Sequence, residues 1–224
     1  MPAAQRGPWT PADIRRGMLL YAVTDSAWLH GRTLASCVRE ALAGGATFVQ
    51  LREKHMSTDE LVEEAKTILP ICREARVPFL IDDDVEAARL VGADGVHVGQ
   101  SDTACAEARR ILGPDAIVGV SAQTVEQAVA AEQAGADYLG VGALIPTPTK
   151  PDAVDVTPEE LARICRAVEI PVVGIGGLHL STIDILDGTG AAGAAVVSAI
   201  FAAEDIERDT RELAGKLSRM ALAR

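Results

Sequence analysis

Short apolar runs alternate along the chain with longer segments in which apolar residues recur every three or four positions. The runs predict eight strands, at residues 18–25, 47–53, 78–81, 95–99, 116–120, 139–145, 171–175 and 194–197. The longer segments predict helices at 34–42, 58–75, 125–134, 158–168, 181–186 and 204–222. Two more helices are predicted after the third and fourth strands, one ending at residue 91 and the other at residue 112. Because a helical crossover makes its flanking strands parallel, eight such units predict an α/β fold, a single (β/α)₈ TIM barrel with outer helices. An open doubly wound sheet is the alternative, but no Gly-x-Gly-x-x-Gly turn follows the first strand.

Composition agrees with many buried parallel strands. Of the 224 residues, 48% are hydrophobic but only 3% aromatic, so Ala, Val, Ile and Leu must build the core. We expect residues 1–17 to be an N-terminal extension, without fixed structure, and residues 18–224 to form the catalytic barrel. The four cysteines include no Cys-x-x-Cys pair, which argues against a zinc site or a disulfide framework.

Charge and hydropathy narrow the classes of partner. The net charge of −11 disfavours nucleic-acid binding, which needs clusters of Lys and Arg. A pocket for a small phosphorylated molecule needs only a few local cations and is not excluded. Without an apolar leader segment or a run of ~18 apolar residues, we expect a cytoplasmic protein that binds no membrane. The sequence leaves open whether the chain forms a homo-oligomer.

Polar residues collect where the predicted strands end. They are Thr24, Asp25, Gln50, Arg52, Asp82, Asp83, Asp84, Gln100, Asp102, Ser121, Thr147, Thr149, Lys150, Gly176, Gly177 and Ser198. In a barrel these positions share the C-terminal rim, where active sites of this architecture lie. This convergence is the main argument from the residues for an enzyme.

Two carboxylates on this rim, Asp83 and Asp102, follow neighbouring strands and suit Mg²⁺, which takes few protein ligands. The alternative is that each caps the helix that follows it. The fork of Arg52 and the point charges of Lys54 and Lys150 suit a phosphate. Arg52 could instead pair with an acidic neighbour on the rim.

The loop at residues 140–152 combines two hydroxyls, Thr147 and Thr149, with Lys150 between three stiffening prolines. These groups could bind an anion such as a phosphate. The alternative, which the pattern supports equally well, is a solvent-exposed connecting loop that binds nothing. Gly176 and Gly177 offer backbone N–H groups to a phosphate, or else simply make a tight turn. His97 alternates with apolar neighbours, so it has either a structural or a catalytic role inside the barrel.

Several motifs together resemble the thiamin phosphate synthase family over residues 19–205. They are Leu-Tyr-Ala-Val-Thr-Asp (20–25), Gln-Leu-Arg-Glu-Lys (50–54), Asp-Asp-Asp-Val (82–85), Asp-Gly-Val-His-Val-Gly-Gln (94–100), Gly-Val-Ser (119–121), Ala-Asp-Tyr (136–138), Thr-Pro-Thr-Lys (147–150) and Val-Gly-Ile-Gly-Gly (173–177). The resemblance implies a Mg²⁺-dependent transferase. It would join 4-amino-2-methyl-5-hydroxymethylpyrimidine diphosphate to 4-methyl-5-(2-phosphoethyl)thiazole, giving thiamin phosphate and pyrophosphate.

The resemblance also implies residue roles. The metal would be held by Asp83 and Asp102, and catalysis would use Arg52, Lys150 and Ser121. The pyrimidine diphosphate would contact Gln50, Leu51, Arg52, Glu53, Lys54, Asp82, Ser121 and Lys150. The thiazole phosphate would contact Thr147, Pro148, Thr149, Gly177, Val197 and Ser198. In the implied chemistry the diphosphate leaves first, so the site must neutralise a developing trianion without a protein nucleophile.

Two residues depart from the family pattern. Asp82 stands where Asn is usual, and a carboxylate there would repel the diphosphate unless it is protonated or bound to metal. Gln123 stands where a His is common, and the related thiazole tautomerase is thought to use that His as its acid and base. Because an amide does not shuttle protons near neutral pH, Gln123 counts against the tautomerase. The other alternative is a non-catalytic barrel that binds a thiamin-related phosphate.

Overall fold

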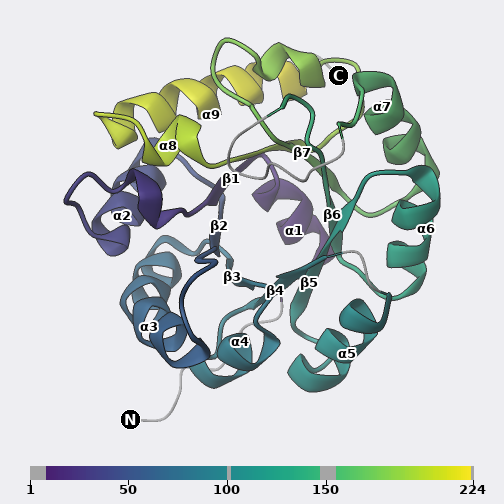
Figure 1. Cartoon of the computed structure of the whole chain (residues 1–224). Helices are drawn as coiled ribbons and strands as arrows, with labels where there is room; N and C mark the ends of the chain where they lie inside the picture. Colours follow the sequence, from purple (N-terminus) through teal and green to yellow (C-terminus); the bar gives the residue numbers. More distant parts are fainter. Residues whose placement is uncertain (1–8, 100–101, 147–154, 223–224) are drawn as a thin grey trace.

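The computed structural model describes residues 9–99, 102–146 and 155–222, and in this part the strands close into an all-parallel barrel in sequence order (Figure 1). The strands are β1 (Leu20–Val23), β2 (Phe48–Leu51), β3 (Phe79–Asp82), β4 (Gly95–Val98), β5 (Ile117–Ala122), β6 (Tyr138–Val141), β7 (Val172–Ile175) and β8 (Gly193–Val196). Closure comes from the pairing of β1 with β8. The predicted (β/α)₈ class is confirmed.

The helices form a ring outside the barrel, apart from α1 (Figure 1). They are α1 (Pro11–Gly17), η1 (Ser26–Trp28), α2 (Leu34–Gly44), α3 (Thr58–Ala75), α4 (Val85–Val91), α5 (Asp102–Leu112), α6 (Val125–Gln133), α7 (Pro158–Ala167), η2 (Ile183–Leu186), α8 (Ser198–Phe201) and α9 (Ile206–Leu222). The apolar pattern of the sequence does not predict α1, η1 or α8. It also predicts that the sixth strand continues to residue 145, whereas β6 ends at Val141.

Local sequence explains where the outer helices begin and end. Ser57 caps α3 by accepting a hydrogen bond from the backbone of Glu60, whose side chain accepts one from the Ser57 backbone in return. Gly45 ends a different helix, α2. It has a φ of 103°, a left-handed conformation that glycine adopts without a Cβ penalty. Caps of this kind fix the lengths of the crossovers and so the positions of the strand ends.

Two apolar clusters hold the barrel together. One lies between the strands and the outer helices, and the other fills the barrel interior. Helix α1 belongs to the interior cluster, because Ile14 is buried there with Tyr21 and Phe48. Part of the expected N-terminal extension therefore packs against one end of the barrel, and the opposite end, where the strands finish, is left for the site. No helix in the described ranges is long and apolar enough to cross a bilayer.

Candidate active site

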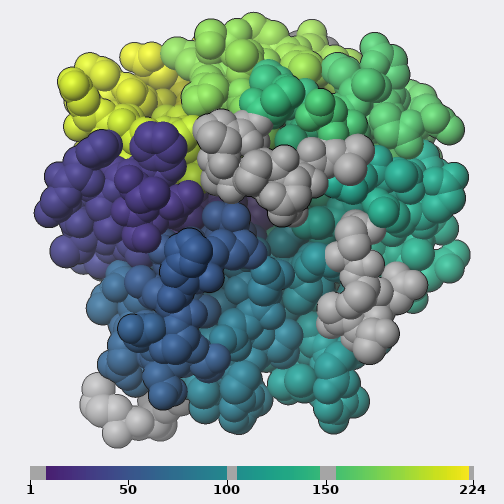
Figure 2. Space-filling model, in the orientation of Figure 1, coloured from purple at the N-terminus to yellow at the C-terminus, as the bar shows by residue number. Residues whose placement is uncertain are grey.

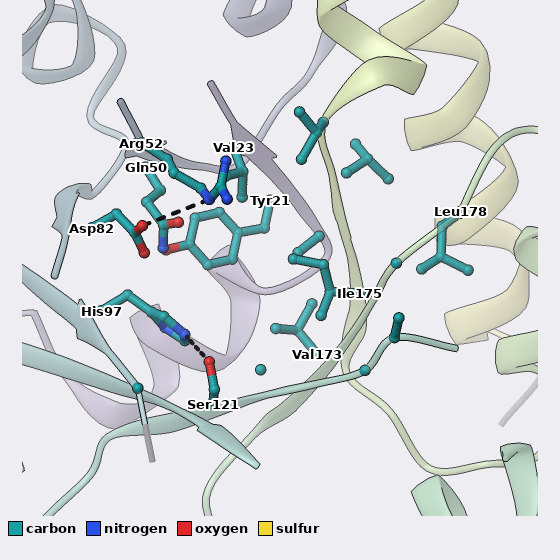
Figure 3. A pocket seen from close by; sticks show the side chains of 18 of the residues that line it. Tyr21, Val23, Gln50, Arg52, Asp82, His97, Ser121, Val173, Ile175 and Leu178 are labelled. Carbon is teal, nitrogen blue, oxygen red and sulfur yellow. Dashed lines mark hydrogen bonds and ion pairs between the residues drawn. The ribbon is translucent and has the colours of Figure 1, made fainter. Parts of the chain in front are cut away.

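A cavity of about 360 Å³ opens at the C-terminal mouth of the barrel and receives side chains from every strand. Figure 2 shows this face, around which blue residues of the first half and green residues of the second half meet. The close view in Figure 3 separates two sides: Arg52, Gln50, Asp82, His97 and Ser121 on one, Val173, Ile175 and Leu178 on the other. A polar wall thus faces an apolar wall across one cavity.

The polar wall begins with a cluster of opposite charges. The ammonium of Lys54 lies 2.6 Å from a carboxylate oxygen of Asp83 and 2.9 Å from one of Asp82. The guanidinium of Arg52 lies 3.6 Å from the same Asp82 oxygen. Burial alone would lower the pKa of Lys54. The hydrogen bonds that Lys54 makes with the two aspartates, together with their negative charges, outweigh the effect of burial and raise that pKa. Arg52 therefore does pair with an acidic neighbour, while still lining the cavity.

The cap alternative for Asp83 is wrong, because Asp84 takes that role. An oxygen of Asp84 accepts the hydrogen bond from Ala87 N at 2.8 Å, and its other oxygen accepts one from Thr58 Oγ1 at 2.7 Å. Asp83 adopts a φ of 59°, in the left-handed region that Asp tolerates better than most residues. Its backbone N–H donates to the carbonyl of His97 at 2.8 Å, which leaves the Asp83 side chain half-exposed at the mouth.

The other predicted metal ligand, Asp102, is the first residue of α5, and its side chain lies outside the described residues. In the part of the chain that is described, no group of three or more His, Cys, Asp or Glu side chains is arranged to hold a metal. The described ligand, Asp83, still suits Mg²⁺. Its exposed carboxylate already faces a cationic group, the Lys54 ammonium, at 2.6 Å, and hard oxygen ligands are those that Mg²⁺ prefers.

Two predicted contacts of the pyrimidine diphosphate do not line the cavity. Leu51 is fully buried in the outer core cluster. Glu53 accepts hydrogen bonds from Ser26 N at 3.1 Å and Thr24 Oγ1 at 3.3 Å, and burial is the main cause that raises its pKa. Glu53 thus fastens the loop after β1, while its neighbours Arg52 and Lys54 line the cavity.

A chain of hydrogen bonds forms the floor of the cavity. Gln50 Nε2 donates to the Tyr21 hydroxyl at 2.8 Å, and that hydroxyl lies 2.8 Å from the hydroxyl of Tyr138. The Tyr138 hydroxyl lies 2.9 Å from His97 Nδ1, and His97 Nε2 lies 3.0 Å from Ser121 Oγ. Sequence reasoning missed both tyrosines. The signal was available, since Tyr21 alternates with apolar residues as a barrel-facing strand residue does.

On the apolar side, the predicted residues for the thiazole phosphate end the last two strands. Gly177 follows β7 with a φ of 64°, and a Cβ there would lie 2.6 Å from Cβ of Ile145, so the close approach of these two segments needs glycine. Val197 and Ser198 follow β8 and also line the cavity, and Ser198 begins α8. The remaining predicted contacts, Thr147, Pro148, Thr149 and Lys150, lie outside the described residues.

Known proteins are similar to this chain over most of its length. The family model described as thiamine monophosphate synthase matches residues 20–200. A thiamine-phosphate synthase of Ruminiclostridium cellulolyticum is 48% identical over 87% of this chain and 92% of its own length. One from Clostridium tetani is 45% identical over 88% of this chain and 94% of its own length.

A solved structure, the thiamine phosphate pyrophosphorylase from Pyrococcus furiosus, superposes with a TM-score of 0.85 at 39% identity. The superposition covers 92% of this chain and 98% of that one. The resemblance drawn from short motifs therefore extends over the whole barrel and over its three-dimensional structure. The chain belongs to the thiamine monophosphate synthase family, a family of transferases of thiamine biosynthesis.

Proposed function

We propose that the protein condenses 4-amino-2-methyl-5-hydroxymethylpyrimidine diphosphate with 4-methyl-5-(2-phosphoethyl)thiazole to give thiamin phosphate and pyrophosphate. The observation that carries the proposal is the two-sided cavity, in which a charged wall faces an apolar one. Such a cavity suits two substrates that each join a flat heterocycle to a phosphate group. The family to which the chain belongs supports the same reaction.

On the charged wall, Arg52 and Lys54 would bind the diphosphate. Arg52 offers a planar fork that suits two phosphate oxygens, and Lys54 adds a mobile point charge beside it. Both cations already face Asp82, so the diphosphate must compete with that carboxylate for them. Lys150 would add a third cation, as the family resemblance implies.

Asp83 and Asp102 would hold Mg²⁺ at the mouth, with the diphosphate supplying further oxygen ligands. When bound, the ion supplies positive charge that offsets the negative charge of the departing pyrophosphate. Lys54 lies 2.6 Å from the Asp83 carboxylate in the free protein, so it would move towards the phosphates as the ion binds.

In the proposed reaction the bond between the pyrimidine methylene carbon and the diphosphate oxygen breaks, and its electron pair leaves with pyrophosphate. The lone pair of the thiazole nitrogen then forms the new C–N bond. Arg52 neutralises the charge that develops on the leaving oxygen atoms. Val173, Ile175 and Leu178 keep water from the methylene cation, which water would otherwise capture.

The thiazole phosphate would bind beside Gly177, Val197 and Ser198, so that its ring lies on the apolar wall. This arrangement holds the two reacting atoms close to each other, and such alignment of reactants accounts for much of an enzyme's rate enhancement. No side chain in this account acts as a nucleophile or a strong base. Gln123 also lines the cavity, and its amide cannot serve as the acid and base that a tautomerase needs.

The test is to incubate the purified protein with both substrates and Mg²⁺ and to measure thiamin phosphate and pyrophosphate. We expect equal amounts of both products. A tautomerase would convert a thiazole isomer without releasing pyrophosphate, and a binding protein would form neither product, so either result would refute the proposal.

A pair of variants makes this test specific to the cavity. Arg52→Met should abolish most of the turnover. Arg39→Met, which removes an exposed arginine of α2 that lies 4.0 Å from Glu74, should leave it unchanged.

A further inference from the structure

The hydrogen-bonded chain on the cavity floor crosses the whole interior of the barrel. Its five members come from five different strands: Gln50 from β2, Tyr21 from β1, Tyr138 from β6, His97 from β4 and Ser121 from β5. All five line the cavity; Gln50 and the two tyrosines are buried, whereas His97 and Ser121 are partly exposed. The chain thus joins two residues of the predicted substrate site through the core.

Glycines on neighbouring strands make room for this chain. A Cβ at Gly119 would lie 2.1 Å from Cζ of Tyr138 and 2.3 Å from its hydroxyl oxygen. A Cβ at Gly140 would lie 3.1 Å from Cε1 of His97. Real side chains do not approach as closely as the Cβ at Gly119 would, and the Cβ at Gly140 would make a tight contact that the imidazole must move to relieve. The absence of a side chain at these two positions therefore lets the phenol and the imidazole meet.

Counting protons gives the chain a direction. Burial raises the pKa of both Tyr21 and Tyr138, so each phenol keeps its one proton and can donate once. Gln50 Nε2 is a donor only, so the Tyr21 oxygen accepts from it. The buried Tyr21 proton needs an acceptor of its own, and the Tyr138 oxygen, 2.8 Å away, provides it. The Tyr138 proton must then go to His97 Nδ1.

The direction continues through the imidazole. A neutral ring carries one proton, so a ring that accepts at Nδ1 carries its proton on Nε2. That proton points to Ser121 Oγ, 3.0 Å away, and makes the serine oxygen an acceptor. Ser121 must in turn direct its own hydroxyl proton to a partner other than His97.

We propose that this chain runs in one direction from Gln50 to Ser121 and thereby fixes the Nε2–H tautomer of His97 and the donor role of Ser121. In the liganded site, Ser121 then donates to an acceptor atom of the substrate, a ring nitrogen or a phosphate oxygen. Tyr21, Tyr138 and His97 are positioning residues, because they act through Ser121. Only the substrate contact rests on the proposed function; the tautomer is a property of the free protein.

The first experiment measures the tautomer directly, by ¹⁵N NMR of protein labelled at histidine, above the pH at which exposed histidines lose their charge. The exposed His30, His55 and His179 serve as references, and His97→Gln assigns the remaining signals. We expect His97 to show a protonated Nε2 and an acceptor Nδ1. In Tyr138→Phe, which removes the donor, the Nδ1 signal should move towards that of an unbonded nitrogen.

A proton on Nδ1 would mean that the chain runs the other way, with the Gln50 amide reversed, and would overturn the proposal. A doubly protonated ring, or an Nδ1 signal unaffected by Tyr138→Phe, would also overturn it. None of these outcomes depends on turnover, so they remain informative if the proposed reaction is absent.

The second experiment is a double-mutant cycle on kcat/KM with Tyr138→Phe and Ser121→Ala. Loss of one oriented hydrogen bond corresponds to about a five- to tenfold decrease, which we expect for Tyr138→Phe in the wild-type background. In the Ser121→Ala background the same change should cost less than about twofold, because the chain then has no serine to orient. Equal losses in both backgrounds would indicate a merely structural tyrosine and would contradict the proposal. Tyr21→Phe repeats the test one link further away.

Discussion

Asp82 places a negative charge on the wall where the proposed diphosphate binds, and removing that charge should strengthen the binding of pyrophosphate. The carboxylate lies 2.9 Å from the Lys54 ammonium and 3.6 Å from the Arg52 guanidinium. Any phosphate that approaches these cations must displace it. Asp82→Asn keeps the size of the side chain and an oxygen that can accept from Lys54, but it removes the charge.

The distance between the Asp82 carboxylate and the Lys54 ammonium sets the size of the expected change in affinity. The Lys54 side chain is 44% exposed but that of Asp82 only 11%, so the dielectric constant of water gives the lower limit of their attraction. Two unit charges 2.9 Å apart attract each other by about 1.4 kcal/mol at the dielectric constant of water. An attraction of that size, lost when the phosphate displaces the carboxylate, corresponds to about a tenfold change in Kd. We therefore expect Asp82→Asn to lower the Kd for pyrophosphate at least about tenfold.

Isothermal titration calorimetry with pyrophosphate and Mg²⁺ measures this change. Asp115→Asn is the matched control, since it makes the same change in net charge at an exposed residue of the loop before β5, outside the cavity. It should leave the Kd within about twofold of the wild-type value, because solvent and salt screen an exposed charge that lies outside the cavity. Weaker binding by Asp82→Asn would refute the reasoning and would indicate that the carboxylate holds the metal instead of competing with the phosphate.

Three further predictions concern the metal, the loop after β1 and the barrel itself. Asp83→Asn and Asp102→Asn should each raise the Mg²⁺ concentration needed for half-maximal activity at least about tenfold, without changing the circular dichroism spectrum. Because burial raises the pKa of Glu53, its folded form holds a proton more tightly than the unfolded one. The free energy of unfolding should therefore fall as the pH rises from about 4.3 through that raised pKa, and chemical denaturation of Glu53→Gln should lack this contribution. Gly95→Ala should destabilise the protein by about 3 kcal/mol in the same assay, because a Cβ there would lie 1.8 Å from the carbonyl oxygen of Ile117.

The barrel could be predicted from the sequence because its signals are local. The strands are mostly apolar residues buried on both faces, and helices such as α2 and α3 carry their own start and stop residues. Helix α1 was missed although its signal is also local. Thr10 caps it, Asp13 returns the hydrogen bond, and Pro11 occupies the first turn. The three prolines of this segment, Pro2, Pro8 and Pro11, and the arginine pair suggested a loose extension and concealed that short capping box.

The division of labour among the three consecutive aspartates could not be predicted. Asp82, Asp83 and Asp84 are chemically identical, and each is a reasonable helix cap or metal ligand. Only the backbone separates them: a φ of 59° at Asp83 turns its carboxylate to the mouth and leaves the cap to Asp84. That conformation depends on a hydrogen bond to His97 of the next strand, a contact between residues that sequence periodicity does not relate.

The same reasoning separates the two halves of the site. Gln50, His97 and Ser121 lie on strands. The two buried tyrosines hold Gln50 and His97, and His97 holds Ser121, so the geometry of all three follows from the packing of the core. A buried hydroxyl without a partner costs roughly 1 to 3 kcal/mol, which makes each link of this chain expensive to break. Arg52, Lys54 and Asp83 instead follow the strand ends and are held by ion pairs at the mouth. Asp82 faces both cations, and Lys54 also faces Asp83. Changes in salt concentration should therefore alter the affinity for the diphosphate much more than they alter the orientation of Ser121.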